Sequence, residues 1–320
     1  MPNENLPVSR LGSAGKDLLL PIVLTVVLFL SIYYVPLAGF FAGMLAPSPI
    51  SLAVIRLGFP NAWLVPCCAA LAGSLALSFV GLTGNIPYLL SLIGMGVLMG
   101  YGLRSKWSTE KVVGLSSLFV IGVAGLFALL AFMDAKGEMV GMLERELREM
   151  ISATLKQFGG SSAENQELET NLLAYVPSVV RIYPGMLVSC SILIAWLNLL
   201  VSRKYCRAAA PECCSFDRLT LWKTPEFLVW FFIAGGLMML LPPEDLRMTG
   251  NNVIIVMGTL YFLQGLAIVS YYFDRWKMPF FIKGFVYAVM FLQQFASIVI
   301  AALGLFDVWF DFRKLVKKPA

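Results

Sequence analysis

The chain has 320 residues, of which 59% are hydrophobic and 13% charged, and its formal net charge is +5. Soluble domains carry about 25% charged residues, so this composition excludes a water-soluble globule as well as a disordered chain. The sequence contains no histidine, which excludes Ser-His-Asp and Cys-His catalytic pairs and imidazole metal sites. Composition therefore predicts an all-α, polytopic integral membrane helical bundle.

A helix that crosses the hydrocarbon core needs about 20 mostly apolar residues. Arg10 and Lys16 precede the first apolar segment, but no small-residue cleavage site follows it, so we expect a retained helix and not a signal peptide. Eight or nine crossings are predicted, at residues 18–35, 37–57, 61–81, 86–103, 112–133, 179–201, 227–241, 252–273 and 280–306.

The second apolar segment is interrupted by prolines. Pro47 and Pro49 flank Ser48, lack backbone donors and bias the preceding residues away from helix. We therefore expect a structured loop and then a short helix from about Pro49 to Leu57. Non-helical backbone at membrane depth is tolerated only where protein or water covers it, so the break is a candidate cavity wall.

Basic residues in the short connections predict the orientation of the bundle. One side, predicted to be cytoplasmic and to hold the N-terminus at a bacterial inner membrane, receives Arg10, Lys16, Arg56, Arg104, Lys106, Lys111, Arg203, Lys204, Arg207, Arg218 and Lys223. Lys277 and Lys283 precede the last segment, whereas Arg313, Lys314, Lys317 and Lys318 follow it. A single crossing cannot place both groups inside, so the side of the tail stays open.

The predicted organisation is a six-helix membrane domain over 1–204, a cytoplasmic loop over 205–224, and C-terminal helices with an amphipathic tail over 225–320. The outer connection 134–178 carries an apolar stripe at i+4 spacing, made of Leu143, Leu147, Ile151 and Leu155. Gly159-Gly160 is expected to end this helix, and Ser161 to Glu164 resembles a capping box that opens another. The amphipathic helix either lies in the membrane interface or packs as a cap.

The candidates for chemistry are few. Cys206, Cys213 and Cys214, with Glu212 nearby, fall short of the four ligands of a structural zinc site, so we expect no metal and no cofactor. No predicted span contains an internal Asp or Glu, and no Gly-rich nucleotide loop is present. The chain is therefore expected to be neither an enzyme nor an ATPase, and to bind lipid but no nucleic acid.

Polar and small residues inside the spans predict helix contacts. Among the polar side chains within the spans, interhelical hydrogen bonds are expected for the glutamines. The full set is Thr25, Asn198, Gln264, Gln293 and Gln294. Close helix packing is expected at the small-residue repeat formed by Gly39, Ala42, Gly43 and Ala46. Arg181 lies near the outer end of its span, where it either reaches the interface or contacts a ligand.

Two stretches carry a resemblance to a known family. Gln264-Gly265-Leu266-Ala267-Ile268-Val269 and the run from Gly304 to Arg313, which reads GLFDVWFDFR, resemble the YybS-like family of uncharacterised bacterial membrane proteins. The resemblance extends over most of the chain in hydropathy and segment order. It implies a membrane bundle but no established activity.

Residues 18–204 also resemble the six-helix substrate-binding S component of energy-coupling-factor vitamin transporters. The resemblance rests on the run from Pro47 to Ile50, which leads to Ile55-Arg56-Leu57-Gly58 and then to a small-residue-rich helix. It implies a ligand site on the outer side, with the candidate residues Ser48, Asn85, Tyr88, Arg181 and Tyr183. The first helix lacks the AxxxA pattern with which S components dock on the coupling protein, and extra helices follow residue 225.

Two functions follow as hypotheses. The first is a recognition or transport component of S-component-like type that takes a small molecule from the outer face. The alternative is a non-catalytic membrane scaffold or regulatory subunit, which would contact a membrane or cytosolic partner protein through residues 202–224.

Overall fold

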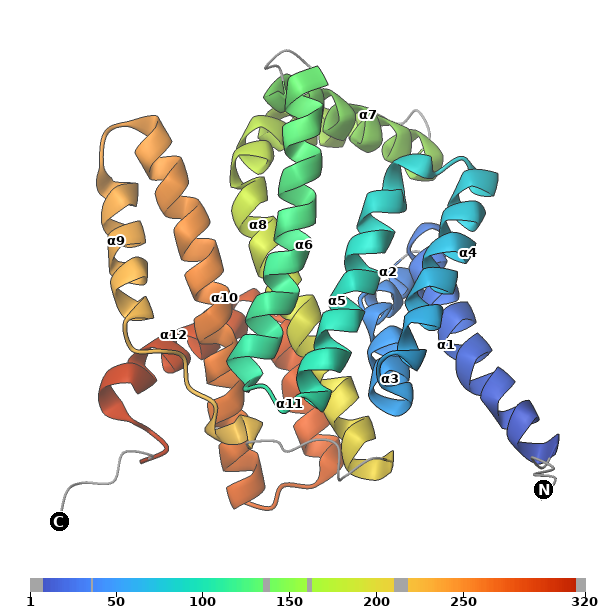
Figure 1. Ribbon diagram of the computed structural model, residues 1–320. Coiled ribbons are helices and arrows are strands. Elements are labelled where there is room, and N and C mark those ends of the chain that lie inside the picture. Colours follow the sequence, from blue (N-terminus) through green and yellow to red (C-terminus); the bar gives the residue numbers. More distant parts are fainter. Residues whose placement is uncertain (1–7, 36, 135–138, 160–162, 210–217, 315–320) are drawn as a thin grey trace, which may run out of the picture. The chain divides into compact units, whose positions relative to one another are not determined.

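The computed structural model describes residues 8–35, 37–134, 139–159, 163–209 and 218–314 (Figure 1). Over these ranges the chain is helical and contains no strand, which confirms the predicted all-α bundle. Six helical stretches are long and apolar enough to span a membrane. Two shorter apolar helices cover 18–34 and 228–240, and a bent helix pair covers 280–310. These stretches fall at the positions of the predicted segments.

The first part of the chain contains helices separated by short turns. In order they are α1 (Val8–Tyr34), α2 (Ala38–Gly43), α3 (Pro47–Leu57), α4 (Leu64–Val80), α5 (Ile86–Arg104) and α6 (Thr109–Asp134). The later helices are α7 (Met139–Gly159), α8 (Ala163–Ala209), α9 (Leu228–Leu240), α10 (Glu244–Arg275), α11 (Phe280–Leu292) and α12 (Gln294–Phe310).

The helices form two compact units. Unit 1 comprises residues 1–129 and 190–216, and unit 2 comprises residues 130–189 and 217–320. Helix α8 contributes its first part to unit 2 and its last part to unit 1. The domain bounds expected from the sequence, at residues 204 and 224, follow the order of the segments and stay a prediction.

Small residues set the helix contacts of unit 1. A Cβ atom on Gly96 or Gly100 of α5 would lie 2.6–2.7 Å from the carbonyl oxygens of Pro47 and Ser51, so α3 packs directly against the backbone of α5. Gly39 of α2 faces α1 in the same way, because a Cβ there would overlap the carbonyl oxygen of Ser31. Neighbouring Gly43 and Ala46 are buried, whereas Ala42 is half-buried.

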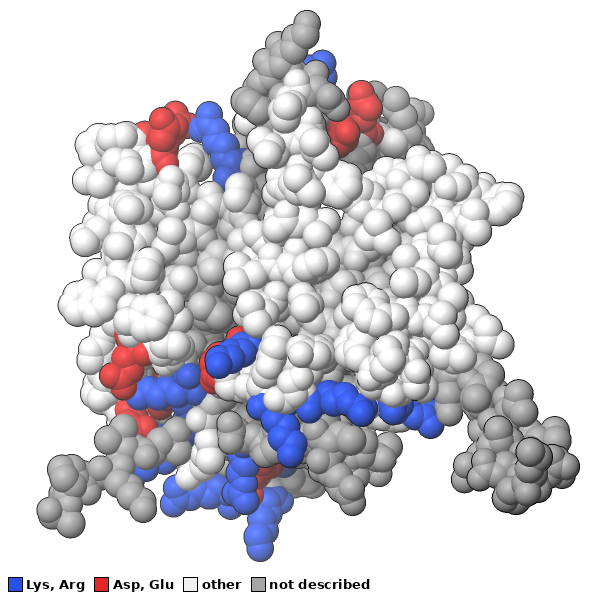
Figure 2. Space-filling view, in the orientation of Figure 1, with Lys and Arg blue, Asp and Glu red and all other residues white. Residues whose placement is uncertain are grey.

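Unit 2 is built around α10, which packs against α9 on one side and α12 on the other. A Cβ on Gly250 would lie 2.6 Å from the carbonyl oxygen of Gly235 in α9. Figure 2 shows the outer faces of α9 and α10 free of charged residues over their middle, with Lys, Arg, Asp and Glu at both ends of the pair. This distribution is typical of helices that cross a bilayer.

The outer connection contains the predicted end of one helix and the predicted start of another. Helix α7 ends at Gly159 and α8 begins at Ala163, but α8 continues without interruption into the sixth span. Helix α8 runs for 47 residues through Pro177 and Pro184. Prolines are tolerated within membrane helices because neighbouring groups satisfy the backbone atoms that they leave unpaired. The expected capping residue Ser161 lies outside the described residues.

The proline-interrupted second segment is more helical than expected. Helix α3 begins at Pro47 and not at Pro49, and residues 38–43 form α2 where a loop was predicted. Prolines fit the first turn of a helix, whose N–H groups have no partner within the helix. The predicted break is confirmed, but it is confined to residues 44–46.

Candidate functional site

The break between α2 and α3 is closed by one side chain of α8. The Nδ2 atom of Asn198 donates to the carbonyl oxygens of Met44 and Ile194, at 2.8 and 2.7 Å. Its Oδ1 accepts a hydrogen bond from Ser48 Oγ at 2.5 Å, and the side chain is fully buried. Asn198 therefore joins α8 to the break, and protein atoms cover the irregular backbone at this point.

A second polar contact joins the same two helices one turn further along. The hydroxyls of Ser51 in α3 and Ser202 in α8 lie 2.6 Å apart and both residues are buried. Together with the Ser48–Asn198 bond, this contact fixes the rotation of α3 about its axis. Ser48, a predicted ligand-binding residue, thus has its hydroxyl directed at Asn198.

The other predicted ligand-binding residues are divided between the units. Asn85 closes a short 3₁₀ turn ahead of α5, and Tyr88 lies in the first turn of α5 with its ring 5.7 Å from that of Phe29. Both belong to unit 1, as Ser48 does. Arg181 and Tyr183 lie in the part of α8 that belongs to unit 2. Their assembly into one ligand site stays a prediction.

Arg181 forms an ion pair with Glu244 at the start of α10. The two side chains are 46% and 55% exposed, so solvent screens much of their attraction. Both side chains are accessible to solvent. The guanidinium group is therefore held in place by a partner that an anionic ligand could displace.

One turn further along α8, an asparagine of α10 bridges two backbone groups. The Gly185 N–H donates to Asn252 Oδ1 at 2.6 Å, and Asn252 Nδ2 donates to the Arg181 carbonyl at 3.0 Å. An undisturbed helix would pair these two groups with each other, four residues apart. A Cβ at Gly185 would lie within 2.7 Å of the Asn252 side chain, so glycine is required for this close contact.

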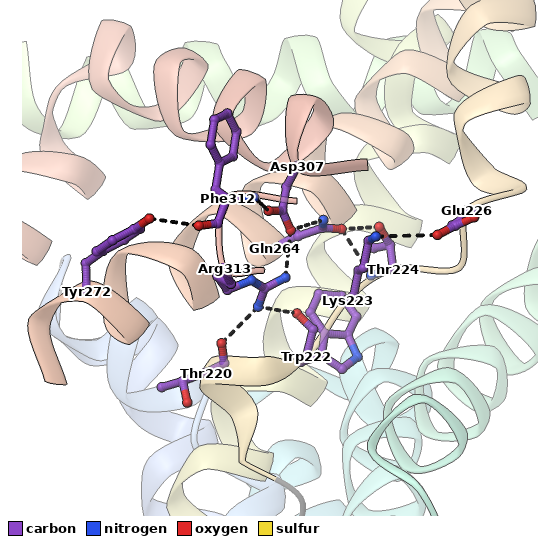
Figure 3. A network of polar contacts seen from close by, with 10 residues as sticks. All are labelled: Thr220, Trp222, Lys223, Thr224, Glu226, Gln264, Tyr272, Asp307, Phe312 and Arg313. Atoms are coloured by element: carbon purple, nitrogen blue, oxygen red, sulfur yellow. Dashed lines mark hydrogen bonds and ion pairs between the residues drawn. The ribbon is translucent and has the colours of Figure 1, made fainter. Parts of the chain in front are cut away.

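A buried polar network lies where α10 meets α12 (Figure 3). Asp307 Oδ2 accepts from Arg313 Nη2 at 2.7 Å and from Gln264 Nε2 at 3.0 Å. The Asp307 and Arg313 side chains are both fully buried. Breaking such a pair by removing one partner leaves an uncompensated buried charge, which costs about 3–5 kcal/mol.

The network also fixes the chain segment that precedes α9. Arg313 Nη1 donates to the carbonyl oxygens of Thr220 and Trp222, both at 2.8 Å. The Thr224 N–H donates to Gln264 Oε1 at 3.0 Å, and the Thr224 hydroxyl donates to the same oxygen. Three separate parts of unit 2 are thus held together by one arginine and one glutamine.

The network was not anticipated from the sequence. The last apolar segment was taken to end at Phe306, which left Asp307 just outside it. Helix α12 continues to Phe310, so Asp307 lies within it. The signal that could have identified the pair is Arg313, six residues further along, whose charge can neutralise Asp307 when the helix ends between them.

Two glycines allow α10 and α12 to approach closely at the network. A Cβ at Gly304 would overlap the carbonyl oxygen of Tyr261, and a Cβ at Gly265 would overlap that of Ile300. Gln264, Gly265, Gly304, Asp307 and Arg313 all lie in the two stretches that carry the family resemblance. These stretches therefore build one helix crossing with a buried ion pair.

Other features that could support chemistry are scarce. Among the described residues, no group of three or more His, Cys, Asp or Glu side chains could hold a metal ion. An open groove of about 420 Å³ follows α12, and its lining is apolar: Val299, Ala302, Leu303, Phe306, Phe310 and Phe312. This groove offers no polar group to orient a reaction.

Comparison with known proteins places the chain in a family. Residues 23–308 match the family described as "Predicted membrane protein (DUF2232)". The chain belongs to this family. It is also similar to the "Uncharacterized protein YybS" of Bacillus subtilis (strain 168), at 21% identity over 306 residues, which cover 92% of this chain and 96% of that protein. The predicted YybS-like resemblance is therefore confirmed. No solved structure matches the chain significantly.

Proposed function

We propose that this integral membrane protein is a non-catalytic component that recognises or transports a small molecule, without ATPase activity of its own. The observation that carries the proposal is a pair of interrupted apolar segments, α2–α3 in unit 1 and α11–α12 in unit 2. Membrane transporters typically place their substrate sites at discontinuous helices. At these two breaks Asn198 and Ser297 bond the Met44 and Met290 carbonyls, so the breaks support the location of a site and side chains would supply the contacts with the solute.

The proposal includes a site and an orientation. The candidate ligand-binding residues remain Ser48, Asn85, Tyr88, Arg181 and Tyr183, on the outer side of a bacterial inner membrane with a cytoplasmic N-terminus. Arg181 supports an anionic ligand, because its exposed pairing with Glu244 is weak enough for a carboxylate or phosphate to replace. The resemblance to S components of vitamin transporters supports the same side of entry.

The test is thermal unfolding of the purified protein in detergent with a library of vitamins and small organic anions. A ligand at 100 times its Kd adds about 2.7 kcal/mol to the free energy of unfolding, which raises Tm clearly. We expect the shift to disappear in Arg181→Ala and to persist in Lys106→Ala, a matched loss of one exposed cation. Absence of any stabilising compound would count against recognition.

A scaffold or regulatory subunit is the second candidate. The observation that favours it is the buried bonding of Ser48 to Asn198, which leaves that hydroxyl facing protein. Under this function the segment 202–224 would contact a membrane or cytosolic protein. Co-purification of one partner with the wild type, lost on deletion of residues 205–217 and independent of small molecules, would favour the scaffold over recognition.

A further inference from the structure

The positive charges around the last helix pair conflict with a single membrane crossing. Lys277 and Lys283 flank the start of α11, and Arg313 and Lys314 follow α12. Basic residues gather on the cytoplasmic side, so one crossing would place one of these pairs on the wrong side. The geometry of α11 and α12 removes this conflict.

The two helices do not form a straight rod. Residues 280–290 and 295–310 are bent by 100° at the break between them. The first of these stretches has 11 residues, and at 1.5 Å per residue it is roughly 16 Å long, about half the thickness of a hydrocarbon core. A rise of that length followed by a turn through 100° does not reach the opposite surface.

Contacts within unit 2 hold both ends of the pair beside the end of α10. Tyr272 lies three residues before the end of α10 at Arg275. Its hydroxyl donates to the Phe312 carbonyl at 2.9 Å. Near the start of α11, Lys283 Nζ pairs with Asp274 at 2.8 Å. The residues that enter α11 and those that leave α12 therefore lie at the same end of α10.

The segment before α9 gives independent support. Arg313 donates to the carbonyls of Thr220 and Trp222, which follow Arg218 and precede the short apolar helix α9. Thr220 and Trp222 lie between the basic residues Arg218 and Lys223, with no membrane-spanning stretch between them. The chain after α12 thus shares a side with the basic residues Arg218 and Lys223.

The surface at this end combines cations with large apolar rings. Lys277 and Lys314 are exposed, as is Arg275. Rings and cations together are typical of a protein surface at the headgroup level of a bilayer. The exposed aromatic side chains are Trp276, Phe280, Phe281, Trp309 and Phe310, with 57–86% of their surface accessible.

We propose that α11 and α12 form a re-entrant pair that enters and leaves the bilayer from the predicted cytoplasmic side, and that the surface formed by Arg275, Trp276, Lys277, Trp309 and Lys314 binds anionic phospholipid headgroups. The aromatic rings insert between the headgroups and the cations pair with the phosphates. This inference concerns a different surface from the proposed ligand site and does not depend on it.

The first test is the side on which single cysteines react. The six natural cysteines are replaced by serine, and Asp245→Cys, Lys277→Cys and Lys314→Cys are labelled with an impermeant maleimide in whole cells and in inverted vesicles. We expect the maleimide to label Lys314→Cys and Lys277→Cys from the same side of the membrane. Asp245→Cys, at the other end of α10, should be labelled from the opposite side. Labelling of Lys314→Cys from the same side as Asp245→Cys would overturn the proposal of a re-entrant pair.

The second test measures lipid retention by the full chain. Protein reconstituted in equal phosphatidylglycerol and phosphatidylcholine is extracted, and its bound lipid is quantified by native mass spectrometry. Each cation near an anionic surface strengthens association about fivefold, so Lys277→Gln with Lys314→Gln should reduce phosphatidylglycerol retention about 25-fold. The control, Lys106→Gln with Lys111→Gln, removes two exposed cations outside the proposed surface and should reduce phosphatidylglycerol retention much less. Equal phosphatidylglycerol retention by the two double variants would overturn the assignment of this surface to lipid. Binding of an acidic protein to the surface would not rescue that assignment.

Discussion

The two interrupted helix pairs close their breaks in different ways. The carbonyl oxygen exposed at Met44, between α2 and α3, is bonded by Asn198, 154 residues away in the sequence. The corresponding carbonyl at Met290, in the last turn of α11 before the break, is bonded by the Ser297 hydroxyl at 2.7 Å, only seven residues away. The first break therefore depends on the tertiary fold, whereas the second carries its own cap.

The difference indicates where each pair receives its stability. A local cap can form as soon as α12 forms, but it does not fix α12 against the rest of unit 2. That role falls to the Asp307–Arg313 pair and to the glycine contacts with α10. In unit 1, Asn198 performs both roles, since it closes the break and joins α3 to α8. Substitutions at these positions should therefore have different effects on the stability of the two breaks.

The largest effect is expected from Arg313→Met. Loss of the guanidinium leaves the Asp307 carboxylate buried without its ion-pair partner, which should lower the free energy of unfolding by about 3–5 kcal/mol. The double variant Asp307→Leu with Arg313→Met removes both charges and should be more stable than the single variant. Thermal unfolding in detergent measures both. A double variant that is less stable than Arg313→Met would contradict the ion-pair interpretation.

The next effect is expected from Asn198→Leu in unit 1. This change leaves the Met44 carbonyl and the Ser48 hydroxyl without their partner in a buried site, at about 1–2 kcal/mol for each unsatisfied group, the lower part of the usual range. We expect a loss of about 2–4 kcal/mol and increased reactivity of a probe cysteine at Leu45. A milder variant, Ser51→Ala, removes the neighbouring Ser–Ser contact alone and should cost about 1 kcal/mol.

A third effect is expected at the crossing of α10 and α12. In Gly304→Ala the new Cβ meets the Tyr261 carbonyl, so the helices must separate, and overpacking of this kind costs about 1–3 kcal/mol. Gly258→Ala is a matched control on α10, because no atom lies within 4 Å of its Cβ position. The control should be neutral or slightly stabilising, since alanine favours helix. Equal losses in both variants would show that close approach is not the cause.

The smallest effect is expected from Ser297→Ala. The lost hydrogen bond is local and half-buried, and it satisfies one carbonyl of the last turn of α11, so the change should cost about 0.5–1.5 kcal/mol. Hydrogen exchange should increase at residues 295–298 and stay unchanged around Gln264. A loss larger than that of Asn198→Leu would reverse the comparison between the two breaks.

The sequence predicted the class and the positions of the apolar segments because these depend on composition and length. It also predicted a break in the second apolar segment, which the structure places at residues 44–46, just before the prolines that open α3. The hydrogen-bonding role of Gln264 was predicted as well, because a buried amide needs a partner. The bend between α11 and α12 has no proline or glycine to signal it. Asp307 escaped prediction because its neutralising arginine lies beyond the apolar run.

Other features could not be read from local patterns. The bridge between Asn252 and the backbone of α8 depends on two segments 67 residues apart, and nothing near Gly185 in the sequence indicates its partner. Likewise, Ser48 was expected to line a cavity because its neighbours break the helix. Whether a polar residue faces a cavity or another side chain is decided by the opposite helix, which a single sequence does not specify.

The length of α8 has a practical consequence for imaging the protein. Its 47 residues extend over roughly 70 Å, more than twice the thickness of the hydrocarbon core. Part of α8 must therefore stand outside the detergent belt, where Ser152 of α7 bonds to Glu169 at 2.6 Å. The start of α8 together with α7 is therefore a suitable epitope for an antibody fragment, which would supply the alignment mark that a small membrane particle lacks in electron cryomicroscopy.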